Sequence, residues 1–239
     1  MATAQTAAQA TDPGAGLIAA PLIVLGGGEH ARVVIEAART QPERWVVQGY
    51  AAPTSAAGTD VSDVPWLGDD TAVAARLADL APDEQPWLVL GFGGGESRDA
   101  LSARVTATEL FGGAARWAVV VHSTAWISPS ATLEPGAVIL AKAVVNAGAR
   151  VGRHAIVNSG AVVEHDVEIG EGSHVAPGAV IGGGTKVGAW TFIGLGANLR
   201  DHIEVGAGAV VGMGAVVVGS ISPGEVVVGV PARRIEPRP

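Results

Sequence analysis

The chain has 239 residues, of which 48% are hydrophobic, only 4% are aromatic and 34 are glycine. Its formal net charge is −8 and its sequence pI is about 5.2, which argues against a protein that works by neutralising nucleic-acid phosphates. It has no cysteine, so disulfides, thiolate metal sites and a cysteine nucleophile are excluded.

The first 16 residues are rich in Ala, Thr and Gln and contain no Lys or Arg. A secretory signal begins with positive charge and continues as an apolar run, and neither feature is present. We therefore expect residues 1–16 to form a disordered tail. No run of about 18 apolar residues occurs, so we expect no membrane partner, and a cytoplasmic location is the default.

Residues 17–122 alternate between short apolar runs and amphipathic stretches. Strands that alternate with helices predict a small parallel α/β domain, with residues 51–63 as a loop. We expect three helices: one after the glycine run 26–28, one that begins at an N-cap at Asp69 or Asp70, and one from about Ser97 to Leu110. The expected strands are Leu22 to Leu25, Trp45 to Tyr50, Trp87 to Phe92 and Trp117 to Val121.

The segment Gly26-x-Gly28-x-x-Ala31 after the first strand loosely matches a dinucleotide-binding fingerprint. That fingerprint also requires an acid after the next strand to hold the ribose, and this chain has Ala51-Ala52 there, which argues against a nicotinamide site. Free N–H groups at a helix N-terminus can still bind phosphate. A phosphate or diphosphate site and a plain strand-to-helix turn both remain open.

From Ile127 to Val217 an aliphatic residue falls at every sixth position. Four residues after each of these positions, beginning at Ala131, lies a second series of mostly small or β-branched residues. A period of six fits neither a helix face nor an alternating strand, and fixed short repeats are typical of solenoids. We expect residues 123–239 to form a parallel β-helix with a triangular cross-section, in which three hexapeptides make one turn and the aliphatic side chains point inwards.

The run from residue 127 to 222 contains 96 residues, which predicts a little over five turns and a height of roughly 25 Å. Glycine often follows the aliphatic position, where we expect it to allow unusual backbone angles in the turns. These glycines are Gly152, Gly170, Gly182, Gly188, Gly194, Gly206 and Gly212.

Glu164-His165-Asp166 is a charged triplet in the turn after Val163. A histidine there can act as a general base near neutral pH, and an adjacent carboxylate raises its basicity. The alternative interpretation of the same residues is a solvent-exposed acidic turn whose histidine has no catalytic role. A catalytic zinc would need three ligands. The four histidines His154, His165, His174 and His202 are 11, 9 and 28 residues apart, and these spacings do not place them one above another in a single chain. A metal site is therefore disfavoured unless ligands converge across subunits.

Three segments resemble the sugar acyltransferases that include sialic acid O-acetyltransferases and bacterial N-acetyltransferases of UDP-4-amino sugars. They are the glycine-rich, Gly-His-like turn at 24–34, the segment Asn158 to Asp166, and the ending Gly229-Val230-Pro231-Ala232-Arg233. The resemblance covers the chain beyond the tail and implies a left-handed β-helix after a Rossmann-like, sugar-nucleotide-binding α/β domain. It also implies acetyl-CoA as co-substrate, no metal, and a homotrimer with active sites between the prisms.

The resemblance also implies roles for individual residues. His165 matches the general base and Asp166 the acid that raises its basicity. His174, Leu195 and Met213 match positions that border the pantetheine arm of CoA. Gly28, Glu29 and His30 match the turn that meets the phosphates of a nucleotide sugar, although the family usually has Gly at the position of Glu29 and often two acids at Ala51-Ala52.

The residues and the resemblance together favour an acetyl-CoA-dependent N- or O-acetyltransferase that acts on an amino sugar or a nucleotide-linked sugar. Two alternatives use the same prism. One is a zinc-dependent hydratase similar to carbonic anhydrases, and the other is a non-catalytic scaffold that binds a sugar nucleotide.

Overall fold

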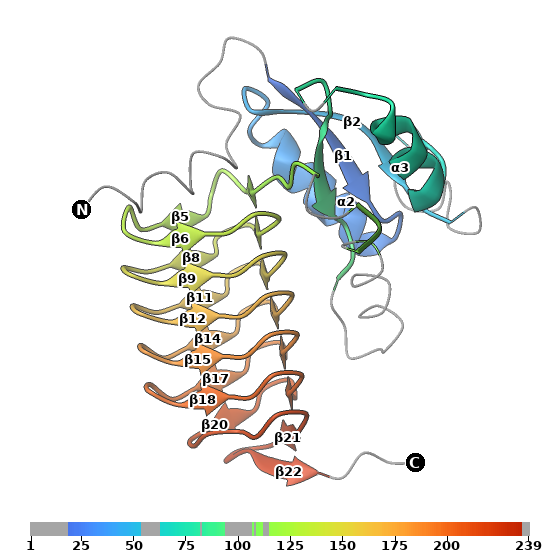
Figure 1. Ribbon diagram of the computed structural model, residues 1–239. Coiled ribbons are helices and arrows are strands. Elements are labelled where there is room, and N and C mark those ends of the chain that lie inside the picture. The colour runs from blue at the N-terminus through green and yellow to red at the C-terminus, as the bar shows by residue number, and fades with distance from the viewer. Residues whose placement is uncertain are drawn as a thin grey trace. The chain divides into compact units, whose positions relative to one another are not determined.

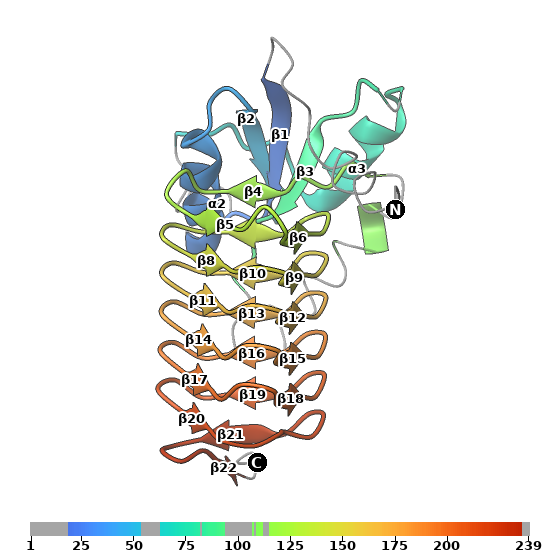
Figure 2. The same ribbon diagram turned by 90° about the vertical axis from the view of Figure 1, so that its left-hand side faces the viewer.

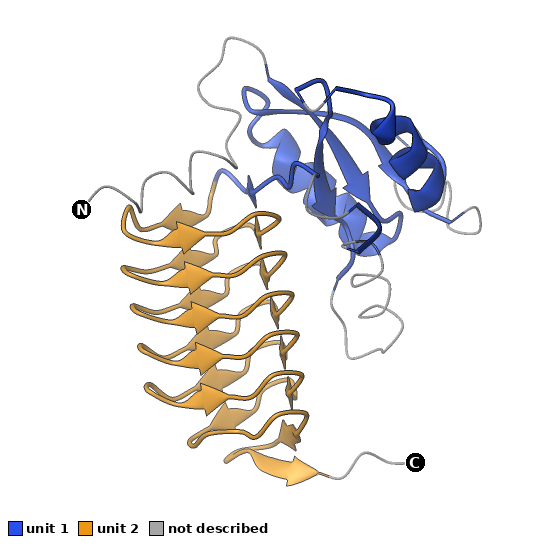
Figure 3. Cartoon of the chain, in the orientation of Figure 1, with its two compact units in different colours: residues 1–93, 97–123 blue, residues 94–96, 124–239 orange. Residues whose placement is uncertain are grey.

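The structure is a computed structural model that describes residues 19–53, 63–81, 83–93, 107, 109–111 and 115–235. The chain divides into two compact units, which Figure 3 shows in different colours. Unit 1 contains residues 1–93 and 97–123, and unit 2 contains residues 94–96 and 124–239. The tail expected at residues 1–16 lies outside the described residues. No helix in the described ranges is long and apolar enough to cross a membrane.

Unit 1 is built on a three-stranded parallel sheet with the strand order β2-β1-β3. Its strands are β1 (Ala20–Leu25), β2 (Trp45–Ala51) and β3 (Trp87–Leu90). Helix α2 (Glu29–Arg39) follows β1 and buries an apolar face that includes Val34 and Ile35. Helix α3 (Asp70–Ala78) begins after Asp69, whose carboxylate accepts a hydrogen bond from the Ala72 N–H at 2.8 Å. The sequence therefore predicted the small parallel α/β class correctly.

Two of the expected elements differ in the structure. The strand expected from Trp117 to Val121 is not continuous: Trp117 makes an isolated bridge with Leu88, and only β4 (Val120–Val121) is a strand. The expected strand is divided because Trp117 bridges to β3, whereas β4 belongs to a different sheet from β1, β2 and β3. The helix expected from about Ser97 to Leu110 lies mostly outside the described residues, although residues 107 and 109–111 are helical.

Unit 2 is a parallel β-helix of about 6 turns. Figure 1 shows its coils stacked along one axis. Each coil contributes a short strand to each of three faces, and Figure 2 shows the strands of a face stacked one above another. The His174 face contains β7 (Val138–Ile139), β10 (Ile156–Val157), β13 (His174–Val175), β16 (Phe192–Ile193), β19 (Val210–Val211) and β21 (Val226–Val228). The Val162 face contains β5 (Trp126–Ile127), β8 (Val144–Val145), β11 (Val162–Val163), β14 (Val180–Ile181), β17 (Asn198–Leu199) and β20 (Val216–Val217). The Lys186 face contains β6 (Thr132–Leu133), β9 (Arg150–Val151), β12 (Glu168–Ile169), β15 (Lys186–Val187) and β18 (Glu204–Val205).

Backbone hydrogen bonds join each coil to the next, and the register is 18 residues except at the last coil, where Val210 pairs with Val226 and Val205 with Ile221. The Val162 N–H, for example, donates to the Ala179 carbonyl at 2.8 Å, and Val162 pairs with Val180. Strand β22 (Arg233–Ile235) follows β21 and pairs with it in the antiparallel direction. Residues 18 apart therefore occupy equivalent places in successive coils.

The interior of the β-helix contains the two sequence series, as the period of six predicts. Every aliphatic residue of the first series from Ile139 to Val217 is buried. The second series is also buried from Ala137 onwards, and its polar members donate hydrogen bonds to carbonyls of the next coil, such as Ser173 to Gly188 at 2.7 Å and Thr185 to Arg200 at 3.0 Å. Buried hydroxyl groups therefore have partners, and the interior stays otherwise apolar.

The faces are joined by four-residue turns, two sets of which concern the site. The His165 corner joins the Val162 face to the Lys186 face and contains residues 128–131, 146–149, 164–167, 182–185 and 200–203, followed by a shorter last turn at 218–220 before Ile221, which pairs with Val205. The Leu195 corner joins the His174 face to the Val162 face and contains residues 140–143, 158–161, 176–179, 194–197 and 212–215.

The expected reason for the glycines that directly follow the aliphatic positions is wrong. The residues with positive φ lie two positions later, in the turns from Gly136 to Gly214, at Gly148, Gly160 and Asp166 for example. At Gly170, by contrast, the constraint is the neighbouring coil, because an added Cβ would lie 2.5 Å from the Ala189 backbone nitrogen. These glycines allow the coils to stack closely.

We expect Gly170→Ala to lower the free energy of unfolding by about 1–3 kcal/mol, because backbone of the next coil has to move. Gly219→Ala is the matched control, since an added Cβ there meets nothing within 4 Å. Urea unfolding of the two variants and the wild type gives the comparison. Equal loss of stability in both variants would contradict the steric explanation.

Candidate active site

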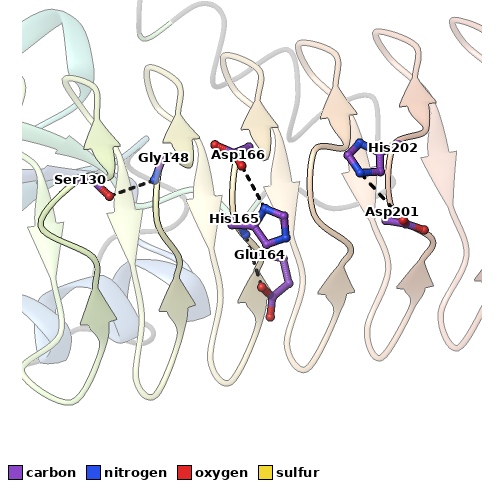
Figure 4. A network of polar contacts seen from close by, with 7 residues as sticks. All are labelled: Ser130, Gly148, Glu164, His165, Asp166, Asp201 and His202. Atoms are coloured by element: carbon purple, nitrogen blue, oxygen red, sulfur yellow. Dashed lines mark hydrogen bonds and ion pairs between the residues drawn. The ribbon is translucent and has the colours of Figure 1, made fainter.

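His165 and Asp166 lie in the turn between β11 and β12, on the His165 corner. Asp166 occupies the left-handed position of the turn, with a φ of 58°, and an aspartate tolerates this conformation better than most residues. The side chains of His165 and Asp166 are 58% and 72% exposed. Figure 4 shows both side chains beside the coil surface, with Glu164 from the same turn.

The His165 Nδ1 atom lies 3.0 Å from the Asp166 carboxylate oxygen Oδ2. Because an ionised carboxylate only accepts hydrogen bonds, this contact places the proton of the neutral ring on Nδ1 and leaves the lone pair on Nε2. The His165 backbone N–H donates to the Glu164 carboxylate at 3.3 Å. The turn therefore presents Nε2 as a proton acceptor.

The hydrogen bond from Asp166 raises the pKa of His165 above its ordinary value of 6.5, and the negative charges of Asp166 and Glu164 act in the same direction. Partial desolvation of the ring opposes these effects but is smaller than the hydrogen bond. The pair therefore makes His165 a stronger base than an isolated histidine.

We expect Asp166→Asn to move the acid limb of the pH profile of kcat/KM to lower pH. With His165 as the base that the sequence predicts, this limb reports the protonation of its ring, and loss of the carboxylate destabilises the protonated ring, so the pKa falls. The maximal rate should fall as well, because the base is weaker. Glu164→Gln is the control and should give a smaller shift, since Glu164 contributes only through its charge. An unmoved limb in Asp166→Asn would contradict the role of the pair.

A second His–Asp pair lies two coils further along the same corner, as Figure 4 shows. The His202 Nε2 and Asp201 Oδ2 atoms are 4.0 Å apart, and the two side chains are largely exposed. This separation exceeds hydrogen-bond distance, so Asp201 does not fix the ring of His202 as Asp166 fixes that of His165.

His174 points outwards from β13 on the His174 face and is nevertheless buried. The Asn158 side-chain Nδ2 lies 3.0 Å from the His174 Nε2, and the His174 ring packs edge-on against Phe192 with centroids 5.4 Å apart. Asn158 and Phe192 thus hold the imidazole in one orientation. Asn158 opens the motif that ends at Asp166, and no role for it was expected from the sequence; the 18-residue coil could have placed it beside His174.

Leu195 and Met213 lie at equivalent places on successive coils of the Leu195 corner and are 49% and 71% exposed. Asn158 belongs to the same corner, next to His174. These residues gather at one edge of the Val162 face, whereas His165 and Asp166 lie at its opposite edge. The structure therefore groups the predicted residues in two sets, which do not meet within one chain.

Gly28, Glu29 and His30 form the start of α2 after β1. Gly28 precedes the first turn of the helix with an extended backbone, and an added Cβ there would meet nothing within 4 Å. The loop after β3 lies beside this turn, because the Gly91 N–H donates to the Leu25 carbonyl at 2.7 Å and Gly93 packs against His30. The strand order β2-β1-β3 reverses direction between these two loops, which is where open α/β sheets bind ligands.

The histidines of the β-helix occupy separate places. His154 is buried in a turn between the Lys186 and His174 faces, while His165 and His202 lie on the His165 corner two coils apart. Within the described residues, no group of three or more His, Asp or Glu side chains is placed to hold a metal ion.

A protein family and several solved structures are similar to this chain. Residues 148–183 match the family model of bacterial transferase hexapeptide, six repeats. Perosamine N-acetyltransferase from Caulobacter crescentus, solved with CoA and GDP-perosamine, is 32% identical, with 93% of this chain and 100% of that chain covered and a TM-score of 0.76. The acetyltransferase domain of PglB from Neisseria gonorrhoeae, solved with acetyl coenzyme A, is also 32% identical, with 91% and 100% covered and a TM-score of 0.76. A comparison with curated sequences gives no match.

A β-helix of hexapeptide repeats with this similarity defines an acyltransferase of the hexapeptide-repeat class. The chain belongs to the sugar acyltransferases of the left-handed β-helix type, which confirms the family resemblance of its sequence motifs.

Proposed function

We propose that the protein transfers the acetyl group of acetyl-CoA to the amino group of a nucleotide-linked amino sugar, with His165 as general base. The observation that carries this proposal is the His165–Asp166 contact of 3.0 Å on an exposed corner, which leaves Nε2 able to accept a proton. The similar proteins that bind GDP-perosamine or acetyl-CoA support the choice of an amino sugar and of this donor.

The chemistry requires no covalent enzyme intermediate. The neutral amine nitrogen attacks the thioester carbonyl carbon while the Nε2 atom of His165 accepts a proton from that nitrogen. An amide bond forms, the carbon–sulfur bond breaks, and the proton passes from His165 to the departing CoA thiolate. Asp166 stabilises the imidazolium that exists between these two proton transfers, and this is where its charge contributes to the rate.

The outward residues of the Val162 face support a homotrimer. Five of these six residues are apolar, Asn198 being the exception, and all are half-buried or exposed in the single chain, whereas the corresponding residues of the Lys186 face are mostly charged. The apolar set is Trp126, Val144, Val162, Val180 and Val216. An extended apolar surface of this kind marks an interface.

Packing of these faces around a threefold axis completes the site. The Val162 face is bordered by the His165 corner on one side and the Leu195 corner on the other. A cyclic, head-to-tail arrangement places the His165 corner of one subunit beside the Leu195 corner of the next. His165 and Asp166 then act on an acetyl-CoA whose pantetheine arm lies along His174, Leu195 and Met213 of the neighbouring subunit.

Unit 1 provides the site for the nucleotide sugar in this proposal, as a Rossmann-like domain. The N–H groups at the start of α2 and the open space around Gly28 suit a diphosphate, with His30 on the same turn. Ala51 and Ala52 are fully buried and provide no carboxylate for the nucleotide base. We expect base recognition to be weaker than in a site with two acids at these positions.

The direct test is release of CoA thiol from acetyl-CoA in the presence of UDP-, dTDP-, GDP- and CMP-linked amino sugars. We expect turnover with an amino sugar and none with the matched sugar that carries a hydroxyl group in place of the amine. Turnover of the hydroxyl compound alone would replace N- by O-acetyl transfer. If calorimetry detects no acetyl-CoA binding and no sugar releases thiol, the protein is not an acetyltransferase, and stoichiometric zinc would then favour a hydratase.

A further inference from the structure

Gly183 lies one coil beyond His165, at the equivalent place of the His165 corner. The other residues at this place in the regular turns of the described coils include Pro129, Ala147 and Asp201, and all three are exposed. Gly183 is buried. Something therefore covers this position that does not cover its equivalents.

The cover is the imidazole ring of His165. A Cβ added to Gly183 would lie 2.6 Å from the His165 Nε2 and 2.7 Å from Cε1, which is too close for any real contact. The backbone of Gly183 does not have a positive φ, unlike that of the next residue, Gly184, with a φ of 65°. The backbone conformation of Gly183 is therefore open to other residues, and glycine is required here because the His165 ring occupies the space of a side chain.

The carboxylate of Asp166, which is the hydrogen-bond partner of the His165 ring, also lies against a glycine, on the preceding coil. A Cβ added to Gly148, one coil before Asp166, would lie 2.5 Å from the Asp166 Oδ1. The two members of the pair thus lean in opposite directions along the corner, each against a glycine. Gly148 has a positive φ of 70°, so its lack of a side chain has a second explanation that Gly183 lacks.

We propose that Gly183 is a positioning residue for His165: its missing side chain lets the imidazole lie against the next coil with Nδ1 on Asp166 and Nε2 at a fixed place. The inference rests on the proposed function, in which Nε2 accepts the proton of the acceptor amine. Gly183 itself touches no reacting atom. A methyl group at this position forces the ring outwards, because the ring is the far end of a side chain that can rotate while the coil backbone cannot move.

The test is Gly183→Ala, with Gly219→Ala as the control, a glycine in the shorter last turn of the same corner where an added Cβ meets nothing within 4 Å. We expect Gly183→Ala to fold with an unchanged melting temperature, because Ala147 occupies the equivalent place two coils before. Its kcat should fall at least tenfold with little change in KM for acetyl-CoA, and Gly219→Ala should match the wild type.

The second readout is the pKa of His165, measured by NMR titration of its ring protons. Displacement from Asp166 should lower this pKa towards 6.5 in Gly183→Ala, as Asp166→Asn does, and leave it unchanged in Gly219→Ala. This titration needs no substrate, so it tests the position of the ring even if no acceptor sugar is turned over. An unchanged pKa, an unchanged kcat, or a Gly183→Ala protein that does not fold would each overturn the inference.

Discussion

Replacement of His165 by alanine should lower kcat by about 10²–10⁴-fold, the usual contribution of a positioned general base. The side chain is exposed and makes its hydrogen bond to Asp166 on the surface of the coil, so its removal leaves no cavity in the interior. The melting temperature and the oligomeric state should therefore stay as in the wild type. The measurement is steady-state thiol release with saturating acetyl-CoA and acceptor.

His202→Ala is the matched control for this substitution. His202 lies on the same corner with a neighbouring aspartate, but at 4.0 Å from Asp201 it is not held as His165 is. Its loss should leave kcat within about twofold of the wild type, well inside the 10²-fold minimum expected for a lost base. A wild-type rate for His165→Ala would rule out His165 as the base.

A charge on the Val162 face should separate the subunits and abolish activity. Val144 points outwards from β8 and is half-buried in the single chain. An aspartate at this position would be desolvated in the proposed trimer, at a cost of several kcal/mol per ion. Since three subunits each bring the charge to the axis, we expect Val144→Asp to be a folded monomer by light scattering, with kcat/KM more than about 10²-fold lower.

Thr132→Asp provides the control for the added charge. Thr132 is the outward residue of β6 on the Lys186 face, where it pairs in register with Arg150. This variant should keep the oligomeric state and the activity of the wild type. A fully active Val144→Asp monomer would show that one chain contains the whole site, against the arrangement in which the Leu195 corner of a neighbour holds the CoA arm.

The regular part of the fold follows directly from the sequence. The spacing of six fixes which side chains point inwards, because a residue out of step would place a polar group inside the coil, and the buried series from Ile139 to Val217 bears this out. In unit 1, the glycine run before α2 and the cap at Asp69 set the helix starts. The strand expected from Trp117 to Val121 divides between two sheets, since strand pairing depends on which neighbouring strand the fold brings alongside.

Local sequence determined the coil and the identity of its charged turn, because both depend on residues within one or two repeats. Only the tertiary structure decided how that turn is used. The contact between His165 and Asp166, the orientation of His174 by Asn158, and the space at Gly183 each depend on groups from the same or an adjacent coil meeting at ångström distances. A period of 18 residues brings these coils together, but the direction in which each side chain leans is set by packing, which spacing does not encode.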